Sequence, residues 1–135
     1  MPKIYLSPST QDWNMYVTGS GSEEYNMNLL ADALVPYLLS NGIQYQRNRP
    51  EMTAGSSIRE ANQGEYDLYL ALHSNAAPEG RYGEERGIIA FYYPGSVGGQ
   101  RAAELIAQEL RKIYPLPNKV TTVSYTHLRA HETRR

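Results

Sequence analysis

The sequence predicts an α/β fold: one domain with a mainly parallel, twisted sheet flanked by helices. Short apolar runs rich in β-branched and aromatic residues alternate with longer amphipathic segments, which is the pattern of strands joined by crossover helices. The length of 135 residues suits one domain and suffices to bury a core. Turn-forming Gly, Pro, Asn and Ser residues separate the segments.

The first strand is expected at residues 3–6, and it leads into a long polar loop at residues 7–21. Long loops of this kind in compact domains are often functional. A helix follows, because Ser20 and Glu23 have the spacing of a capping box. The apolar residues of this helix recur at helical spacing, and Ser40-Asn41-Gly42 ends it.

The later elements continue the alternation. A strand is followed by a short helix that ends at Gly64, then by two further strands, and the last helix stops before a proline pair. The expected ranges are a strand at 43–47, a helix at 56–63, strands at 67–73 and 87–93, and a helix at 98–113.

The composition excludes several classes of function. The net charge of −1 gives no basic footprint for nucleic acid, and the sequence has neither a transmembrane span nor the apolar start of a signal peptide. The absence of cysteine excludes disulfides and thiolate metal sites. We expect a monomer that binds no nucleic acid and has no membrane span; the sequence does not indicate its localisation.

One apolar run, residues 67–77, ends in the polar side chains of His73, Ser74 and Asn75. Ligands bind at the carboxyl ends of strands in open parallel sheets, so His73 is a candidate site residue. A histidine bonded to a neighbouring loop explains it equally well. Asn75 is a candidate for substrate contact, and a turn-forming Asn is the alternative.

A second candidate is Glu24. Extending the apolar face of the first helix backwards from Met27 and Asn28 reaches this carboxylate, whereas Glu23 is explained as a cap. A buried carboxylate is costly unless it is paired or binds a metal. The alternative is that Glu24 complements the helix dipole at an exposed first turn.

The chain changes character at Val123. Residues 123–135 resemble a sequencing adapter translated in one frame, so we expect the natural domain to span residues 1–122 and the remainder to be a non-native tail. The tail contains His127, His131 and Glu132, but their order differs from that of the zincin motif. They are therefore not taken as a metal site.

Two stretches carry a resemblance to a known family: residues 24–34 (EYNMNLLADAL) and 61–76 (ANQGEYDLYLALHSNA). With the strand at 87–93, they resemble the zinc-dependent N-acetylmuramoyl-L-alanine amidases of the type-3 family. The resemblance implies hydrolysis of the amide between N-acetylmuramic acid and L-alanine in peptidoglycan. It also implies Glu24 and His73 as zinc ligands. A catalytic zinc supplies both an activated water and a Lewis acid for such a reaction.

Two parts of the family pattern are missing. The family has a second histidine ligand after the first strand, where this chain has Pro8-Ser9-Thr10; in some relatives that His would align with Trp13. Three alternatives stay open: Gln11 or Asp12 replaces this histidine as a ligand, the site binds the metal weakly, or the ligands are arranged differently from those of the family.

The second missing part is the general-base Glu, which the family carries near its C-terminus. No Glu in residues 1–122 matches it, and we also expect the final strand and the last helix of the family domain to be missing. We therefore expect impaired catalysis. A metal-free peptidoglycan-binding relative of the same fold is the alternative function.

Overall fold

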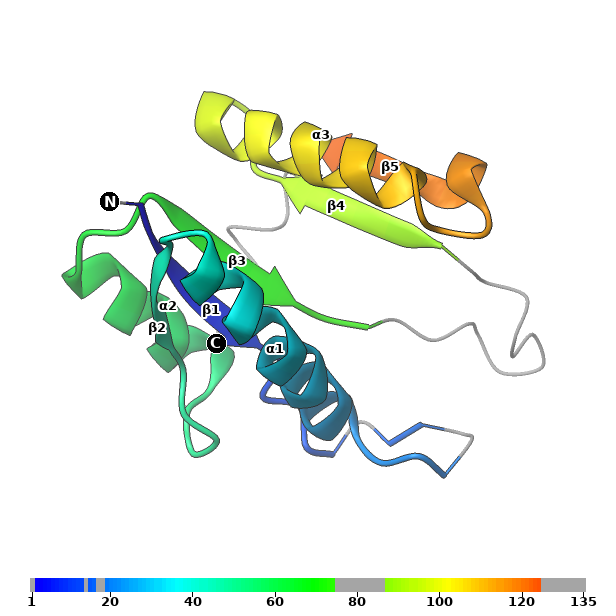
Figure 1. Cartoon of the computed structure of the whole chain (residues 1–135). Coiled ribbons are helices and arrows are strands. Elements are labelled where there is room, and N and C mark those ends of the chain that lie inside the picture. Colours follow the sequence, from blue (N-terminus) through cyan, green and yellow to red (C-terminus); the bar gives the residue numbers. More distant parts are fainter. Residues whose placement is uncertain (1, 14, 17–18, 75–86, 125–135) are drawn as a thin grey trace. The chain divides into compact units, whose positions relative to one another are not determined.

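The computed structural model describes residues 2–13, 15–16, 19–74 and 87–124. It is a mixed α/β structure with parallel strands and three α-helices in the described residues, which confirms the predicted fold class (Figure 1). In chain order the elements are β1 (Lys3–Pro8), α1 (Glu23–Ser40), β2 (Gln44–Arg47), α2 (Ala54–Gln63), β3 (Leu68–Leu72), β4 (Ile88–Tyr92), α3 (Val97–Arg111), the 3-10 helix η1 (Pro117–Lys119) and β5 (Val120–Ser124).

The described elements fall into two compact units. The first contains β1, α1, β2, α2 and β3, and the second contains β4, α3, η1 and β5. In the first unit β1 is the central strand of a three-stranded sheet in the order β2-β1-β3, and both pairings are parallel. Because the strands are parallel, the carboxyl ends of β1 and β3 lie at the same edge of the sheet.

The two faces of β1 have different chemistry. Ile4 and Leu6 are buried in an apolar cluster with Ala31 and Leu38 of α1. Partly buried residues of α1, β2 and β3 complete this cluster: Leu34, Val35, Ile43, Tyr45, Leu68, Leu70 and Leu72. The alternating residues of β1 point to the opposite face, as the pleat of a strand requires.

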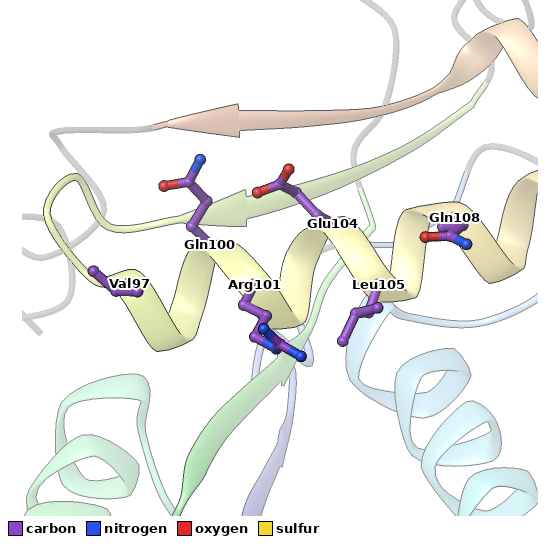
Figure 2. Close-up of a pocket in the computed structure, with 6 residues that line it drawn as sticks. All are labelled: Val97, Gln100, Arg101, Glu104, Leu105 and Gln108. Atoms are coloured by element: carbon purple, nitrogen blue, oxygen red, sulfur yellow. The ribbon is translucent and has the colours of Figure 1, made fainter.

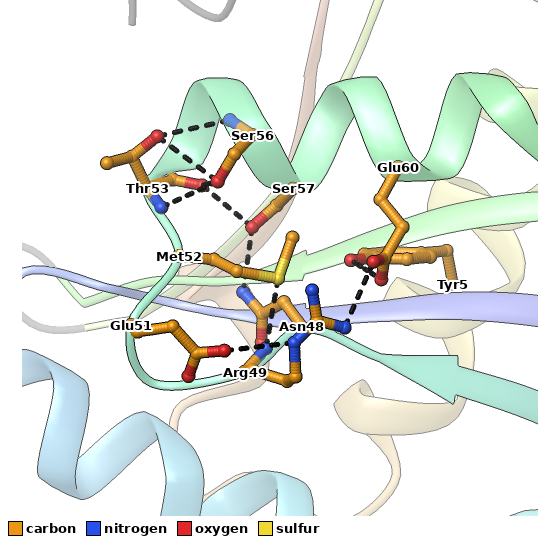
Figure 3. Close-up of polar contacts among 9 residues, drawn as sticks. All are labelled: Tyr5, Asn48, Arg49, Glu51, Met52, Thr53, Ser56, Ser57 and Glu60. Carbon is orange, nitrogen blue, oxygen red and sulfur yellow. Dashed lines mark hydrogen bonds and ion pairs between the residues drawn. The ribbon is translucent and has the colours of Figure 1, made fainter.

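The opposite face carries a polar network that attaches α2 to the sheet (Figure 3). The hydroxyl of Tyr5 donates to Glu60 of α2 over 2.8 Å, and Arg49 forms an ion pair with the same carboxylate at 3.0 Å. The buried amide of Asn48 lies 3.2 Å from the hydroxyl of Ser57, also on α2. Directional bonds therefore position α2, whereas apolar burial positions α1.

The second unit is a parallel pair, β4 and β5, against which α3 packs. The small side chains of Ala103 and Ala107 are buried and allow a close approach of the helix. Gly87 precedes β4 with φ +134°, and a Cβ there would lie 2.4 Å from the carbonyl oxygen of Lys119. A glycine is needed at this position because a side chain would meet the backbone that leads into β5.

Strand β5 was not predicted from the sequence. It begins at Val120 and continues through Val123 and Ser124, the first two residues of the segment expected to be a non-native tail. Helix α2 begins two residues before its predicted start, with Thr53 as the N-cap. Among the helices described, none has both the length and the hydrophobicity needed to cross a bilayer.

Candidate functional site

A buried carboxylate and a histidine meet at the edge of the first sheet. Glu23 is the first residue of α1 and its side chain is only 2% exposed; His73 directly follows β3 and is 44% exposed. Glu23 Oε2 lies 3.0 Å from His73 Nδ1. An ionised carboxylate can only accept, so the Nδ1–H of His73 donates in this bond. The fold thus joins two residues that are 50 positions apart in the sequence.

The N-cap of α1 explains why the carboxylate of Glu23 can bond to His73. Ser22 has an extended backbone and is the N-cap, and its hydroxyl accepts from the N–H of Tyr25 over 3.0 Å. The predicted capping box of Ser20 and Glu23 is therefore wrong. Because Ser22 caps the helix, the carboxylate of Glu23 is not needed there and lies against the sheet.

Glu24, the metal ligand expected from the sequence, occupies a different place. Its side chain is half-buried, its N–H donates to the carbonyl of Gln11 over 3.3 Å, and its carbonyl accepts from the amide of Asn28. The structure thus brings Glu23, rather than Glu24, to His73. Adjacent helical residues point about 100° apart because the helix has about 3.6 residues per turn, so one shift in position changes which carboxylate faces inward.

The surroundings of Glu23 keep it ionised. Burial raises the pKa of Glu23, but hydrogen bonds from His73, from the hydroxyl of Ser9 and from the backbone of Ser74 lower it, and the net result is a pKa below the ordinary value. Bonds to the charged form favour that form. The carboxylate is therefore an anion at neutral pH.

The pair lies where the sheet predicts a ligand site. Ser9 follows the last residue of β1 and is buried, and its N–H donates to the carbonyl of Leu72 over 2.9 Å. Leu72 is the last residue of β3. The carboxyl ends of two neighbouring parallel strands and the amino end of α1 thus converge on Glu23, as expected for an open α/β sheet.

The loop between β1 and α1 contributes a further polar residue. The hydroxyl of Tyr16 lies 2.6 Å from the hydroxyl of Ser74, the residue after His73. The loop turns back on itself through a bond from the N–H of Tyr16 to the carbonyl of Gly21, 2.9 Å, and a bridge between Met15 and Ser22. The length of this loop is visible in the sequence, but no local signal there singles out Ser9, Tyr16 or Ser74 as site residues.

The other candidate residues lie elsewhere in the loop between β1 and α1 or outside the described residues. Asp12 is exposed, and its N–H donates to the carbonyl of Thr10. The N–H of Gln11 donates to the hydroxyl of Ser9. Asn75 and the tail residues His127, His131 and Glu132 lie outside the described residues. Within the described ranges, no group of three His, Cys, Asp or Glu residues could hold a metal ion.

The donor set of the pair fits part of a zinc site. Zinc accepts imidazole nitrogen and carboxylate oxygen as ligands. Nδ1 of His73 carries the proton of the 3.0 Å hydrogen bond to Oε2, so a zinc ion held by these two atoms would have to displace that proton. The chemistry of the two groups therefore suits two ligands of a zinc site.

A concave surface lies on α3 (Figure 2). All six of its lining residues come from this one helix: Val97, Gln100, Arg101, Glu104, Leu105 and Gln108. It contains none of the predicted site residues, so Glu23 and His73 remain the candidate site.

Comparisons of the chain with protein-family models, with curated proteins and with solved structures found no match.

Proposed function

We propose that this protein is a zinc-dependent peptidoglycan hydrolase that cleaves the amide between N-acetylmuramic acid and L-alanine. The metal ligands in this proposal are Glu23 and His73. The observation that carries the proposal is the buried Glu23 carboxylate, held 3.0 Å from His73 at the carboxyl edge of parallel strands. The resemblance of residues 61–76 to the type-3 amidases supports the same reaction.

The residues around the pair have defined tasks in this proposal. Glu23 supplies a carboxylate oxygen that is already ionised, and bonds from Ser9 and from the backbone of Ser74 fix its orientation. His73 supplies an imidazole nitrogen from the exposed side of the pair. When bound, zinc supplies a Lewis acid and an activated water for amide hydrolysis. The described residues assign no general base.

A metal-free peptidoglycan-binding protein is the second candidate, and one observation favours it. Glu23 already receives hydrogen bonds from His73, Ser9 and Ser74, so its burial is compensated without a cation. A carboxylate that orients a histidine in this way is common outside metal sites. The surface around the pair would then bind the wall polymer without cleaving it.

Zinc content separates the two candidates. The protein is equilibrated with zinc, freed of unbound metal and measured for metal per chain, together with His73→Ala. The hydrolase predicts about one zinc per chain in the wild type and a strong loss in His73→Ala, because a structural or catalytic zinc rarely tolerates the loss of a ligand. Wall binding by a zinc-free wild type would contradict the hydrolase and support the binding protein.

Hydrolysis is measured separately on purified cell walls. The wild-type chain is compared with the same chain carrying His73→Ala, in long incubations because catalysis is expected to be impaired. The proposal predicts release of free N-terminal alanine by the former only. Equal release by both chains would refute the role of His73.

A further inference from the structure

The loop that joins β1 to α1 is attached to the site at several points. At its start, the hydroxyl of Ser9 bonds to Glu23, and the carbonyl of Gln11 accepts from the N–H of Glu24 in the first turn of α1. Further along, the hydroxyl of Tyr16 lies 2.6 Å from that of Ser74. The loop is therefore held against both the strand end and the helix start that form the candidate site.

Between these attachments the loop exposes a large aromatic side chain. Trp13 is the only tryptophan of the chain and is 73% exposed, although it lies between the attached residues Gln11 and Tyr16. Tryptophan is highly buried on average in folded proteins, since its large ring loses apolar contact with water on burial. An anchored loop that nevertheless keeps an indole in solvent is well suited to hold that ring for a ligand.

We propose that Trp13 is a stacking platform for a sugar ring of the glycan strand beside the Glu23–His73 pair. This inference rests on the proposed function for its substrate and adds the residue that would bind the saccharide. One face of a pyranose ring presents C–H groups that pack on an aromatic face, while its edge carries hydroxyl groups. Next to Trp13 the loop carries the exposed carboxylate of Asp12, a group that can accept hydrogen bonds from such hydroxyl groups.

The distances along the chain allow one ligand to reach both features. Trp13 lies four positions after Ser9, so their Cα atoms lie at most about 14 Å apart. The bond from Ser9 to Glu23 places the start of this span at the site. A glycan on Trp13 could thus present an attached lactyl amide to the pair. The Tyr16–Ser74 bond has a distinct role, because it anchors the loop that carries the platform.

The single tryptophan makes the test direct. Wild-type protein is titrated with an N-acetylglucosamine trimer, which carries no peptide, and the emission of Trp13 is followed. Calorimetry with the same probe then compares Trp13→Ala with Tyr37→Ala, a change at another exposed aromatic residue, on α1. We expect a saturable emission change in the wild type, roughly tenfold weaker binding in Trp13→Ala because the aromatic face is lost, and wild-type binding in Tyr37→Ala.

Tyr16→Phe tests the anchor. This variant keeps Trp13 and an aromatic ring at position 16 but loses the hydroxyl that reaches Ser74. Weaker binding of the trimer with an intact circular dichroism spectrum is the expected result. Trp13→Phe retains an aromatic face and should restore part of the affinity lost in Trp13→Ala. If Trp13→Ala does not fold, the wild-type titration and Trp13→Phe still decide the question.

The outcomes distinguish this inference from the proposed function. If the trimer leaves the emission of Trp13 unchanged while zinc binds, the platform is refuted and the metal proposal stands. If the trimer binds through Trp13 but zinc does not bind, the hydrolase is refuted and the platform stands. An emission change with a free stem peptide, but none with the trimer, would also refute the saccharide platform.

Discussion

The truncation of Leu6 tests the packing of the first sheet. Leu6 is 0% exposed at the centre of β1, where it packs in the cluster with Ile4, Ala31 and Leu38. Leu6→Ala removes three side-chain carbons, which accounts for roughly 2.4 kcal/mol at about 0.8 kcal/mol per buried methylene. The cavity left behind adds to this loss, because strands on both sides of β1 restrict collapse. We therefore expect the free energy of unfolding to fall by about 3–4 kcal/mol.

Urea denaturation followed by far-ultraviolet circular dichroism measures this change. The matched control is Leu39→Ala, which makes the same chemical change on α1 at a side chain that is 60% exposed. The control should change the free energy of unfolding by less than about 0.5 kcal/mol. If Leu6→Ala and Leu39→Ala cost the same, then β1 is not the centre of the core and the description of the first unit is wrong.

Three further changes probe other parts of the fold. Gly21→Ala should cost about 1–2 kcal/mol in urea denaturation, because Gly21 has φ +104° and a Cβ would lie 2.9 Å from a neighbouring tyrosine ring, whereas Gly98→Ala on α3 meets open space and should stabilise slightly. Asn48→Ala should cost about 2 kcal/mol by the same assay, since its buried amide lies 3.0–3.2 Å from three oxygen acceptors. Burial, then the hydrogen bond to Glu60 and its charge, raise the pKa of Tyr5 above its ordinary value. The raised pKa favours the neutral form, so stability should be complete below the unfolded pKa of about 10 and fall as pH rises above it, and Tyr5→Phe should show a smaller fall in urea midpoint between pH 9 and pH 11.

The strand and helix pattern could be predicted because it depends on local periodicity. The alternation of short β-branched runs with amphipathic segments located β1, β2, β3, β4 and the three helices to within a few residues. Strand β5 was missed although Val120-Thr-Thr-Val-Ser124 is rich in β-branched residues. Its last two residues belong to the segment expected to be a non-native tail. The pairing of β5 with β4 has no local sequence signal beyond the content of β-branched residues.

The inward carboxylate shows where sequence reasoning reached its limit. The sequence favoured Glu24 as the carboxylate that faces the sheet and Glu23 as a cap, whereas the structure buries Glu23 and leaves Glu24 half-buried. Which of Glu23 and Glu24 faces inward depends on which serine caps the helix. The sequence pattern favours Ser20 as the cap, whereas the structure has Ser22. The buried positions 23, 31 and 38 are separated by about two helical turns each, and this spacing could have identified Glu23.

The contacts that surround the pair were not predictable from local pattern. Ser9 and Ser74 are ordinary loop residues in the sequence, and they reach Glu23 only because β1 and β3 are adjacent in the sheet. The contact of Tyr16 with Ser74 likewise depends on how the loop folds back. Such contacts are set by strand order, which periodicity does not specify.

Zinc affinity in two matched variants tests the central claim most directly. Glu23→Gln and Glu24→Gln remove the same charge from adjacent residues of α1 and are compared with the wild type by competition with a zinc chelator. We predict that Glu23→Gln weakens zinc binding by about tenfold or more, because the Glu23 carboxylate is the one that lies 3.0 Å from His73. Glu24→Gln should bind zinc as the wild type does. Loss of affinity in Glu24→Gln with normal affinity in Glu23→Gln would contradict the proposed site.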